Sequence, residues 1–185
     1  MTVRPERPSD YAAVRAVVAA AFRGAGHAAP PLDATGDPGE AVLVEWLRSD
    51  AGYLPELALV AELDGSVVGH VLCTRAWLAP EDPGSPDIPV LGLGPLAVSP
   101  DHQGHGIGSR LLKEVVKAAT GEDERLIALL GDPGFYGQRG WEPASRHGIA
   151  APEPEWEDFF QVRLLPADDG ARGRFRYAAP FARLE

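Results

Sequence analysis

The chain has 185 residues, 45% of them hydrophobic, which is enough to bury the core of a domain. Its formal net charge of −10 argues against general binding of DNA or RNA, which needs clustered Lys and Arg side chains. No apolar run approaches the ~20 residues of a membrane-spanning helix, and the first residues lack the apolar region of a secretory signal. We therefore expect a cytoplasmic protein that binds neither nucleic acid nor membrane.

The first fifty residues predict one strand and two helices. A short strand over 2–5 precedes a helix that ends near Phe22, with Ser9 as its N-cap. Residues 24–39 are rich in Gly, Pro and Ala and predict a long loop, of a kind that is often functional or mobile. A second helix is expected over 40–49.

Three strands are expected next, over 57–63, 66–77 and 88–98. Asp64-Gly65 joins the first two and is a hairpin-turn signal. The third contains Gly92, Gly94 and Pro95, which disfavour regular pairing on both sides. A bulge, or a point where the strand leaves its neighbour, would explain these three residues.

The second half continues the mixed pattern. A glycine-rich turn over 100–108 opens a helix that runs to about Ala119. A strand, a short helix, an extended segment and a last strand follow, at 125–130, 135–139, from Gly140 and at 159–165. This order predicts an α/β or α+β fold whose sheet is covered by helices on both faces.

The most informative segment is a strand, a turn with glycines at alternate positions and a helix start: Leu96-Ala97-Val98-Ser99-Pro100-Asp101-His102-Gln103-Gly104-His105-Gly106-Ile107-Gly108. Glycine lets the backbone approach a ligand closely. A helix start presents free N–H groups and the positive end of the helix dipole. A pyrophosphate is the natural ligand of such a turn.

Three phosphate-binding patterns compete for this turn. A P-loop needs Gly-Lys-Ser/Thr where the chain has Gly108-Ser109-Arg110. A dinucleotide-binding fingerprint counted from Gly104 needs a glycine in place of Ser109. The third pattern, Gln/Arg-x-x-Gly-x-Gly/Ala, is matched in full from Gln103 to Gly108.

This third pattern resembles the GCN5-related N-acetyltransferases (GNAT). A second segment, from Phe135 to Trp141, is similar to the family's Phe-Tyr-x-x-x-Gly-Phe, with Trp141 in place of Phe. The resemblance extends over about residues 2–165, and the tail is similar to a subgroup of predicted bacterial acetyltransferases. It implies a mixed, mostly antiparallel central sheet with helices on both faces and a splayed fourth strand. It also implies a single domain over 1–185, with 166–185 as a C-terminal extension packed on it.

The resemblance further implies that acetyl-CoA is the cosubstrate and that no metal is needed. Strand backbone would pair with the pantetheine arm, and the turn would bind the pyrophosphate, at Leu96, Ala97, Val98, Gln103, Gly104, His105, Gly106, Ile107, Gly108 and Ser109. Tyr136 would act as the catalytic acid that protonates the departing thiolate. Two positions depart from the family pattern, because His105 stands where Arg is frequent and Asp132 where Asn is frequent.

The implied reaction moves an acetyl group onto a primary amine of a small molecule or peptide, by direct attack in a ternary complex. Some base must take the amine proton. His70, Glu62 and a water-mediated base are the candidates, although a structural role is expected for both residues. The alternative function is a catalytically silent domain that binds acyl-CoA as a sensor or structural unit. The resemblance also suggests a homodimer.

Other chemistry has weaker support. Asp101, His102 and His105 are interpreted as a polar turn rather than a metal site, and no Gly-x-Ser-x-Gly elbow of a serine hydrolase occurs. Cys73 lies in an apolar stretch and is expected to be a buried, unreactive side chain. The tail, with its Arg and aromatic residues, is expected to cover a sheet edge. Lining the acceptor site or forming a dimer contact are its alternative roles.

Overall fold

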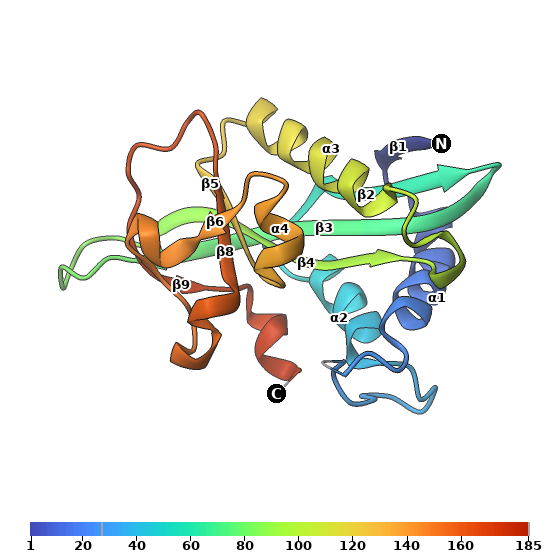
Figure 1. The fold of residues 1–185 in the computed structure, drawn as a ribbon. Coiled ribbons are helices and arrows are strands. Elements are labelled where there is room, and N and C mark those ends of the chain that lie inside the picture. The colour runs from blue at the N-terminus through green and yellow to red at the C-terminus, as the bar shows by residue number, and fades with distance from the viewer. Residues whose placement is uncertain (27, 185) are drawn as a thin grey trace.

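The computed structural model describes residues 1–26 and 28–184 (Figure 1). Its helices are α1 (Tyr11–Phe22), α2 (Gly39–Arg48), α3 (Ile107–Gly121) and α4 (Pro133–Gly137). Its strands are β1 (Thr2–Pro5), β2 (Tyr53–Leu63), β3 (Ser66–Ala79), β4 (Ile88–Val98), β5 (Leu126–Leu130), β6 (Glu142–Pro143), β7 (Ile149–Ala150), β8 (Phe160–Leu164) and β9 (Gly173–Arg176).

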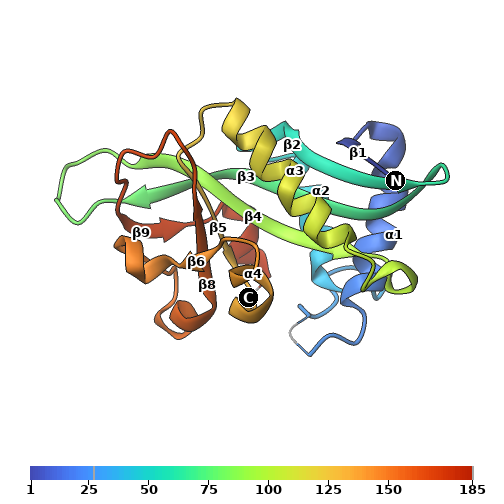
Figure 2. The same cartoon turned by 45° about the horizontal axis from the view of Figure 1, so that its top comes forward.

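The strands form one mixed sheet in the order β1-β2-β3-β4-β5-β8-β6, and β9 pairs with β3 and β7. Among the described pairs, only β4–β5 and β7–β9 are parallel. Figures 1 and 2 show α3 over one face of β2–β4, with α1 and α2 on the other face. The expected mostly antiparallel sheet with helices on both faces is confirmed.

Each face of the sheet has its own apolar core. Leu111 and Val115 repeat at helical spacing on α3 and pack, fully buried, against β2, β3 and β5. On the opposite face, Val18 of α1 and Leu47 of α2 are fully buried against β2 and β3. Burying one such side chain contributes about 1.5–3 kcal/mol. A third cluster surrounds Phe175, where side chains of β8 and β9 pack against the C-terminal end of β3.

The start of α1 differs from the expectation. Ser9 is not the N-cap, because a 3₁₀ turn over Pro8–Asp10 precedes the helix. The Asp10 carboxylate takes over the local hydrogen bonding: it accepts the Arg7 backbone N–H at 2.8 Å and an Arg4 guanidinium hydrogen bond at 2.7 Å. The predicted hairpin is confirmed, since Asp64 and Gly65 both adopt left-handed backbone conformations with φ of 50° and 81°.

The C-terminal tail contains a strand that was not predicted. β9 pairs with the end of β3 at Trp77, Leu78 and Ala79, beyond the point where β2 has left that edge. Gly173 has a φ of 139°, and a Cβ there would overlap the Ala79 carbonyl, so the approach of the two strands requires glycine. The tail therefore covers a sheet edge, as expected.

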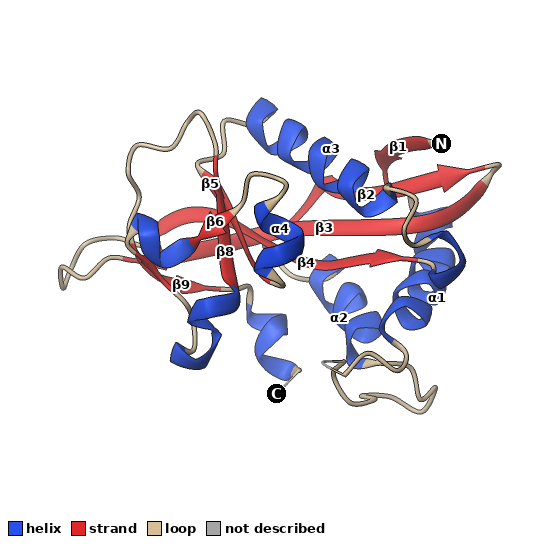
Figure 3. Ribbon diagram, in the orientation of Figure 1, coloured by secondary structure: helices blue, strands red, loops and turns tan. Residues whose placement is uncertain are grey.

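β4 and β5 pair only briefly and then diverge. Their register comprises Leu91↔Ile127 and Gly92↔Ala128, and Figure 3 shows β5 and β8 crossing the long strands steeply. The pairing of β3 with β4 also shifts between Val71 and Cys73. The glycines of β4 thus mark a departure from its neighbour, and the splayed fourth strand is confirmed.

The same glycines make room for the tail. A Cβ on Gly92 would lie 2.8 Å from Cδ1 of Tyr177, and one on Gly94 would lie 3.4 Å from Cε1 of Phe181. The Tyr177 and Phe181 rings lie 4.5 Å apart and follow β4 along the splay. Glycine in this strand therefore permits both the divergence and the close approach of two aromatic rings.

Candidate active site

The turn before α3 is shaped by two glycines in the left-handed region. Gly104 and Gly106 have φ of 77° and 79°, and a Cβ on either would meet no atom within 4 Å. Gly106 is the N-cap of α3 and offers no side-chain cap. The first N–H groups of the helix, at the positive end of its dipole, therefore have no side-chain cap.

Two polar side chains hold the turn against the end of β4. The Gln103 side-chain amide donates to the Val98 carbonyl oxygen at 3.0 Å. His105 Nδ1 lies 2.8 Å from the Gln103 carbonyl oxygen. Both side chains thus stabilise the conformation of the turn, and its backbone N–H groups are candidates for binding a ligand.

The predicted pantetheine-binding strand has one free edge. Leu96, Ala97 and Val98 pair with β3, and no described strand pairs with them on the other side, although the Val98 carbonyl accepts the Gln103 amide. Ala97 is buried toward α1 and α2, and its two neighbours pack toward α3. A free edge with both faces covered is the geometry that an extended chain can join by backbone hydrogen bonds.

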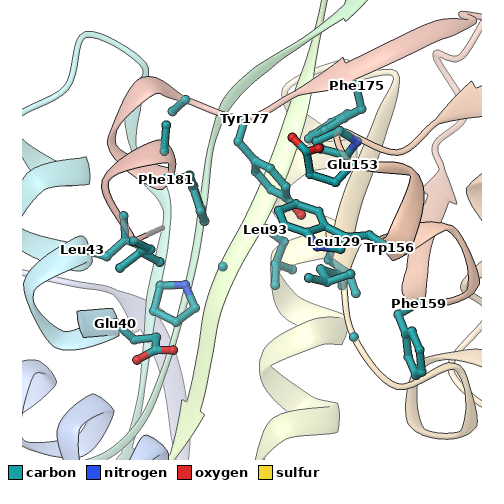
Figure 4. A pocket seen from close by; sticks show the side chains of 18 of the residues that line it. Glu40, Leu43, Leu93, Leu129, Glu153, Trp156, Phe159, Phe175, Tyr177 and Phe181 are labelled. Carbon is teal, nitrogen blue, oxygen red and sulfur yellow. The ribbon is translucent and has the colours of Figure 1, made fainter. Parts of the chain in front are cut away.

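A cavity of about 1050 Å³ lies between the diverging strands. Its walls come from β4, the end of β5, α2, the β7–β8 connection and the tail, and it includes Tyr136. Figure 4 shows Glu40, Leu43 and Phe181 on one side of β4, and Glu153, Trp156 and Phe159 on the other. The cavity thus extends from the point where β4 and β5 diverge, and segments that are distant in the sequence form its walls.

Tyr136 is held by rings and by a glycine. Its ring centroid lies 4.9 Å from that of Phe135 and 5.8 Å from that of Trp141, both in edge contact. A Cβ on Gly131 would overlap the Tyr136 ring, so this position requires glycine. Burial raises the pKa of Tyr136 to about 12, against the opposing charge of Arg139. The phenol is therefore protonated at neutral pH and can donate a proton.

The residues after β5 have a structural role that the sequence did not reveal. The Asp132 carboxylate accepts the Gly134 N–H at 2.8 Å and caps α4. Its hydrogen bond serves the helix that presents Tyr136.

Arg139 supplies a positive charge beside the turn. Its Nε donates to the Ser109 hydroxyl at 2.7 Å, and its guanidinium carbon lies 3.8 Å from the Phe135 ring centroid. Within residues 1–26 and 28–184 it forms no ion pair with a carboxylate. Sequence reasoning missed this residue because it noted only the absence of Arg at His105.

Neither residue suggested as the base borders the cavity. Glu62 is 2.7 Å from the Arg4 guanidinium at the β1–β2 edge. His70 is fully buried, with Nε2 at 3.3 Å from Glu6 Oε2, and burial lowers the pKa of its imidazole. Burial alone would raise the pKa of Glu6, but the nearby His70 imidazole and hydrogen bonds from Arg48 and Tyr53 lower it below its usual range. Both residues belong to structural networks.

The tail lines the cavity, which was one of its expected alternative roles, and α2 contributes a group that was not expected there. Tyr177 is inserted at the splay, and burial raises the pKa of its phenol despite a hydrogen bond from the Leu130 backbone. Glu40 borders the cavity from the first turn of α2. Both positions depend on contacts between distant segments, and no local motif marks them.

Other site types find no support among the described residues. No group of three or more His, Cys, Asp or Glu side chains in this part of the chain is placed to hold a metal ion. Cys73 is fully buried, and burial raises the pKa of its thiol. No described helix has the length and hydrophobicity of a membrane span.

Comparison with known proteins points to one family. The acetyltransferase (GNAT) family profile matches residues 28–140, more than half of the chain. The N-acetyltransferase YhbS of Escherichia coli is 32% identical over 187 residues, covering 100% of both chains. YjhQ, also an E. coli N-acetyltransferase, is 38% identical over 117 residues, so that this match spans only 62% of either chain.

Solved structures agree with the sequence matches. The crystal structure of YhbS in complex with CoA has a TM-score of 0.82 at 28% identity, covering 100% of this chain and 93% of that one. A GNAT acetyltransferase from Brucella melitensis in complex with acetyl-CoA has a TM-score of 0.74 at 30% identity, covering 97% of each chain. The chain therefore belongs to the acetyltransferase (GNAT) family and is an acyltransferase.

Proposed function

We propose that this protein transfers the acetyl group of acetyl-CoA to the nitrogen of a primary amine, by direct attack of the amine within a ternary complex. One observation carries the proposal: β4 leaves β5 after Gly92 and leads through the turn to the uncapped N-terminus of α3, and a cavity fills the space between the strands. The similar structures from E. coli and Brucella melitensis hold CoA or acetyl-CoA, which supports the same donor here.

The residues present fit a coenzyme with an extended arm and a pyrophosphate. The free edge at Leu96, Ala97 and Val98 would pair with the pantetheine arm, and the backbone from Gln103 to Gly108 would bind the pyrophosphate. Ser109 and Arg139 would act together, because the guanidinium already donates to the Ser109 hydroxyl. Arg139 would thereby supply the fixed positive charge that His105 lacks.

When bound, the coenzyme supplies an activated acyl group as a thioester. Tyr136 would give its proton to the departing sulfur, since its phenol is protonated and borders the cavity. Backbone N–H groups at the splayed part of β4 would stabilise negative charge on the carbonyl oxygen. The aromatic side chains of the tail line the cavity and would help to exclude water from the site.

We extend the proposal to the organisation of the chain. The tail pairs with β3 and lines the cavity, so residues 166–185 would be an integral extension of one domain. We also propose a cytoplasmic location, as expected from the hydropathy pattern of the sequence, and a homodimer, as suggested by the family resemblance.

The test is a turnover assay with acetyl-CoA and a panel of amines, run with a thermal-shift assay for coenzyme binding. The proposal predicts both stabilisation by acetyl-CoA and release of free thiol that depends on an amine. Stabilisation without turnover of any amine would instead favour a silent acyl-CoA-binding domain. Absence of both would contradict the donor site itself.

A further inference from the structure

We propose that Glu40 binds the ammonium group of the acceptor and takes its proton, and that the acceptor is a small primary amine on an apolar or aromatic body. This inference rests on the proposed function and names the acceptor side of the same cavity. The evidence is the buried carboxylate of Glu40, one oxygen of which has no hydrogen-bond partner among the described residues. Aromatic and acidic side chains line the same cavity.

Glu40 is held at the cavity wall by one of its two carboxylate oxygens. Oε1 accepts the Ala29 backbone N–H at 2.8 Å, which joins the 24–39 loop to the first turn of α2. Oε2 is buried and has no hydrogen-bond partner among the described residues. The residue is 8% exposed and borders the cavity. Buried carboxylates are normally paired, so this oxygen is suited to an ammonium ligand.

The other charged groups of the cavity favour a cation. Asp132, Glu153 and Glu155 add three carboxylates to that of Glu40. The two cations of the wall are already engaged: Arg176 pairs with Asp87, and Arg174 donates to the backbone carbonyls of Ala151 and Pro152. The cavity therefore has an excess of negative charge, which attracts an ammonium group.

The remaining walls favour an apolar body. Trp156 and Phe159 stand on one side of β4 and Phe181 on the other, and Tyr177 lies between them at the splay (Figure 4). Aromatic faces attract cations and bury flat apolar groups. An arylalkylamine presents both features to this cavity, whereas a polyamine presents only charge.

The step balances as follows. The ammonium group gives one proton to the Glu40 carboxylate, which later releases it to solvent. The freed nitrogen bonds to the thioester carbonyl carbon, and the carbon–sulfur bond breaks. The sulfur takes the proton of the Tyr136 phenol, and the second proton lost by the nitrogen restores that phenol. The products are an N-acetyl amide, free CoA and one proton.

The test compares wild type with Glu40→Gln, using phenethylamine and acetyl-CoA between pH 7 and pH 9. Glutamine keeps an oxygen for the Ala29 N–H but carries no charge and takes no proton. Glu56→Gln is the matched control, because Glu56 is exposed on β2 outside this cavity. Coenzyme-induced thermal stabilisation, measured on all three proteins, reports folding and the donor site independently of activity.

We expect Glu40→Gln to lower kcat/KM at pH 7 by at least ~100-fold, within the range of a lost general base. Only the free amine is productive in that variant. Because alkylammonium groups titrate near pH ~10, its kcat/KM should rise about tenfold per pH unit. Wild type and Glu56→Gln should be nearly flat over the same range.

Two results would overturn the inference and leave the proposed function standing. One is an equal loss of kcat/KM at every pH, which would show that Glu40 only positions the loop. The other is a wild-type enzyme that prefers spermidine or a peptide amino terminus to phenethylamine by more than tenfold, a result that does not depend on any variant. If no amine is acetylated at all, the proposed function fails, and the inference fails with it.

Discussion

Replacing Arg139 by Met should weaken coenzyme binding without unfolding the protein. The guanidinium is preorganised, since it donates to Ser109 at 2.7 Å and stacks 3.8 Å from the centroid of the Phe135 ring. It has no carboxylate partner among the described residues, so binding a phosphate would not require an existing ion pair to break. Met preserves most of the apolar contact with Phe135 and removes the charge.

The magnitude follows from the lost interaction. A hydrogen bond to a charged group is worth about 1.5–3 kcal/mol, which corresponds to ~10- to ~150-fold in Kd. Arg139 is partly exposed, so the lower end of this range is expected. Arg139→Lys should lie between wild type and Met, because it keeps the charge but loses the planar fork.

Isothermal titration of CoA measures this effect directly. The wild-type Kd should rise with salt more steeply than that of Arg139→Met, because one screened attraction is missing from the variant. Arg125→Met is the control, since Arg125 pairs with Asp169 at the opposite end of β5. Equal Kd values and equal salt dependence for wild type and Arg139→Met would refute the assignment of Arg139 to the phosphates.

Three further predictions concern catalysis and stability. Tyr136→Phe should lower kcat by ~10- to ~100-fold with an unchanged Kd for CoA. The loss should be only partial, because a thiolate leaves readily even without an acid. An unchanged kcat at saturating coenzyme would remove Tyr136 from the mechanism. Gly131→Ala should displace the Tyr136 ring, costing about 1–3 kcal/mol in urea unfolding and lowering kcat; a variant with wild-type values of both would contradict this packing. The folded pKa of His70 is depressed below 6.5, so below that pH the unfolded state binds more protons and stability falls, by at most about 1.4 kcal/mol per pH unit. The unfolding free energy, measured at pH 7.5, 6.5 and 5.5, should fall with pH in wild type and fall less in His70→Leu. Equal slopes in the two proteins would show that His70 does not cause the pH dependence.

Short sequence patterns predicted those parts of the site that are formed by residues close together in the chain. Alternate glycines predicted the turn, because Gly104 and Gly106 need left-handed conformations that other residues resist. Gly92 and Gly94 likewise predicted the departure of β4 from its neighbour. The helix-capping prediction at Ser9 failed, because Asp10 and Arg4 form a hydrogen-bonded pair that competes with a simple cap.

The acceptor side could not be predicted in the same way. Tyr177 reaches Gly92 from 85 positions later in the chain, through the pairing of β9 with β3. Glu40 is held at the cavity wall by the Ala29 N–H, a contact that depends on how the segment before α2 folds. The contact of Arg139 with Ser109 spans 30 residues. Such placements follow from tertiary packing, which hydrophobic periodicity and short motifs do not encode.

If the turn before α3 and the splay of β4 form the coenzyme site, acetyl-CoA should raise the thermal stability of the protein. Wild type should be compared with Gly106→Trp and with Gly84→Trp, a matched control in the β3–β4 connection. Both glycines have positive φ and open space around the missing Cβ, so both variants carry similar backbone strain. At ~100 times its Kd, the ligand should stabilise wild type and Gly84→Trp by ~2.7 kcal/mol and leave Gly106→Trp unchanged. Equal stabilisation of all three proteins, or of none at millimolar ligand, would contradict the account.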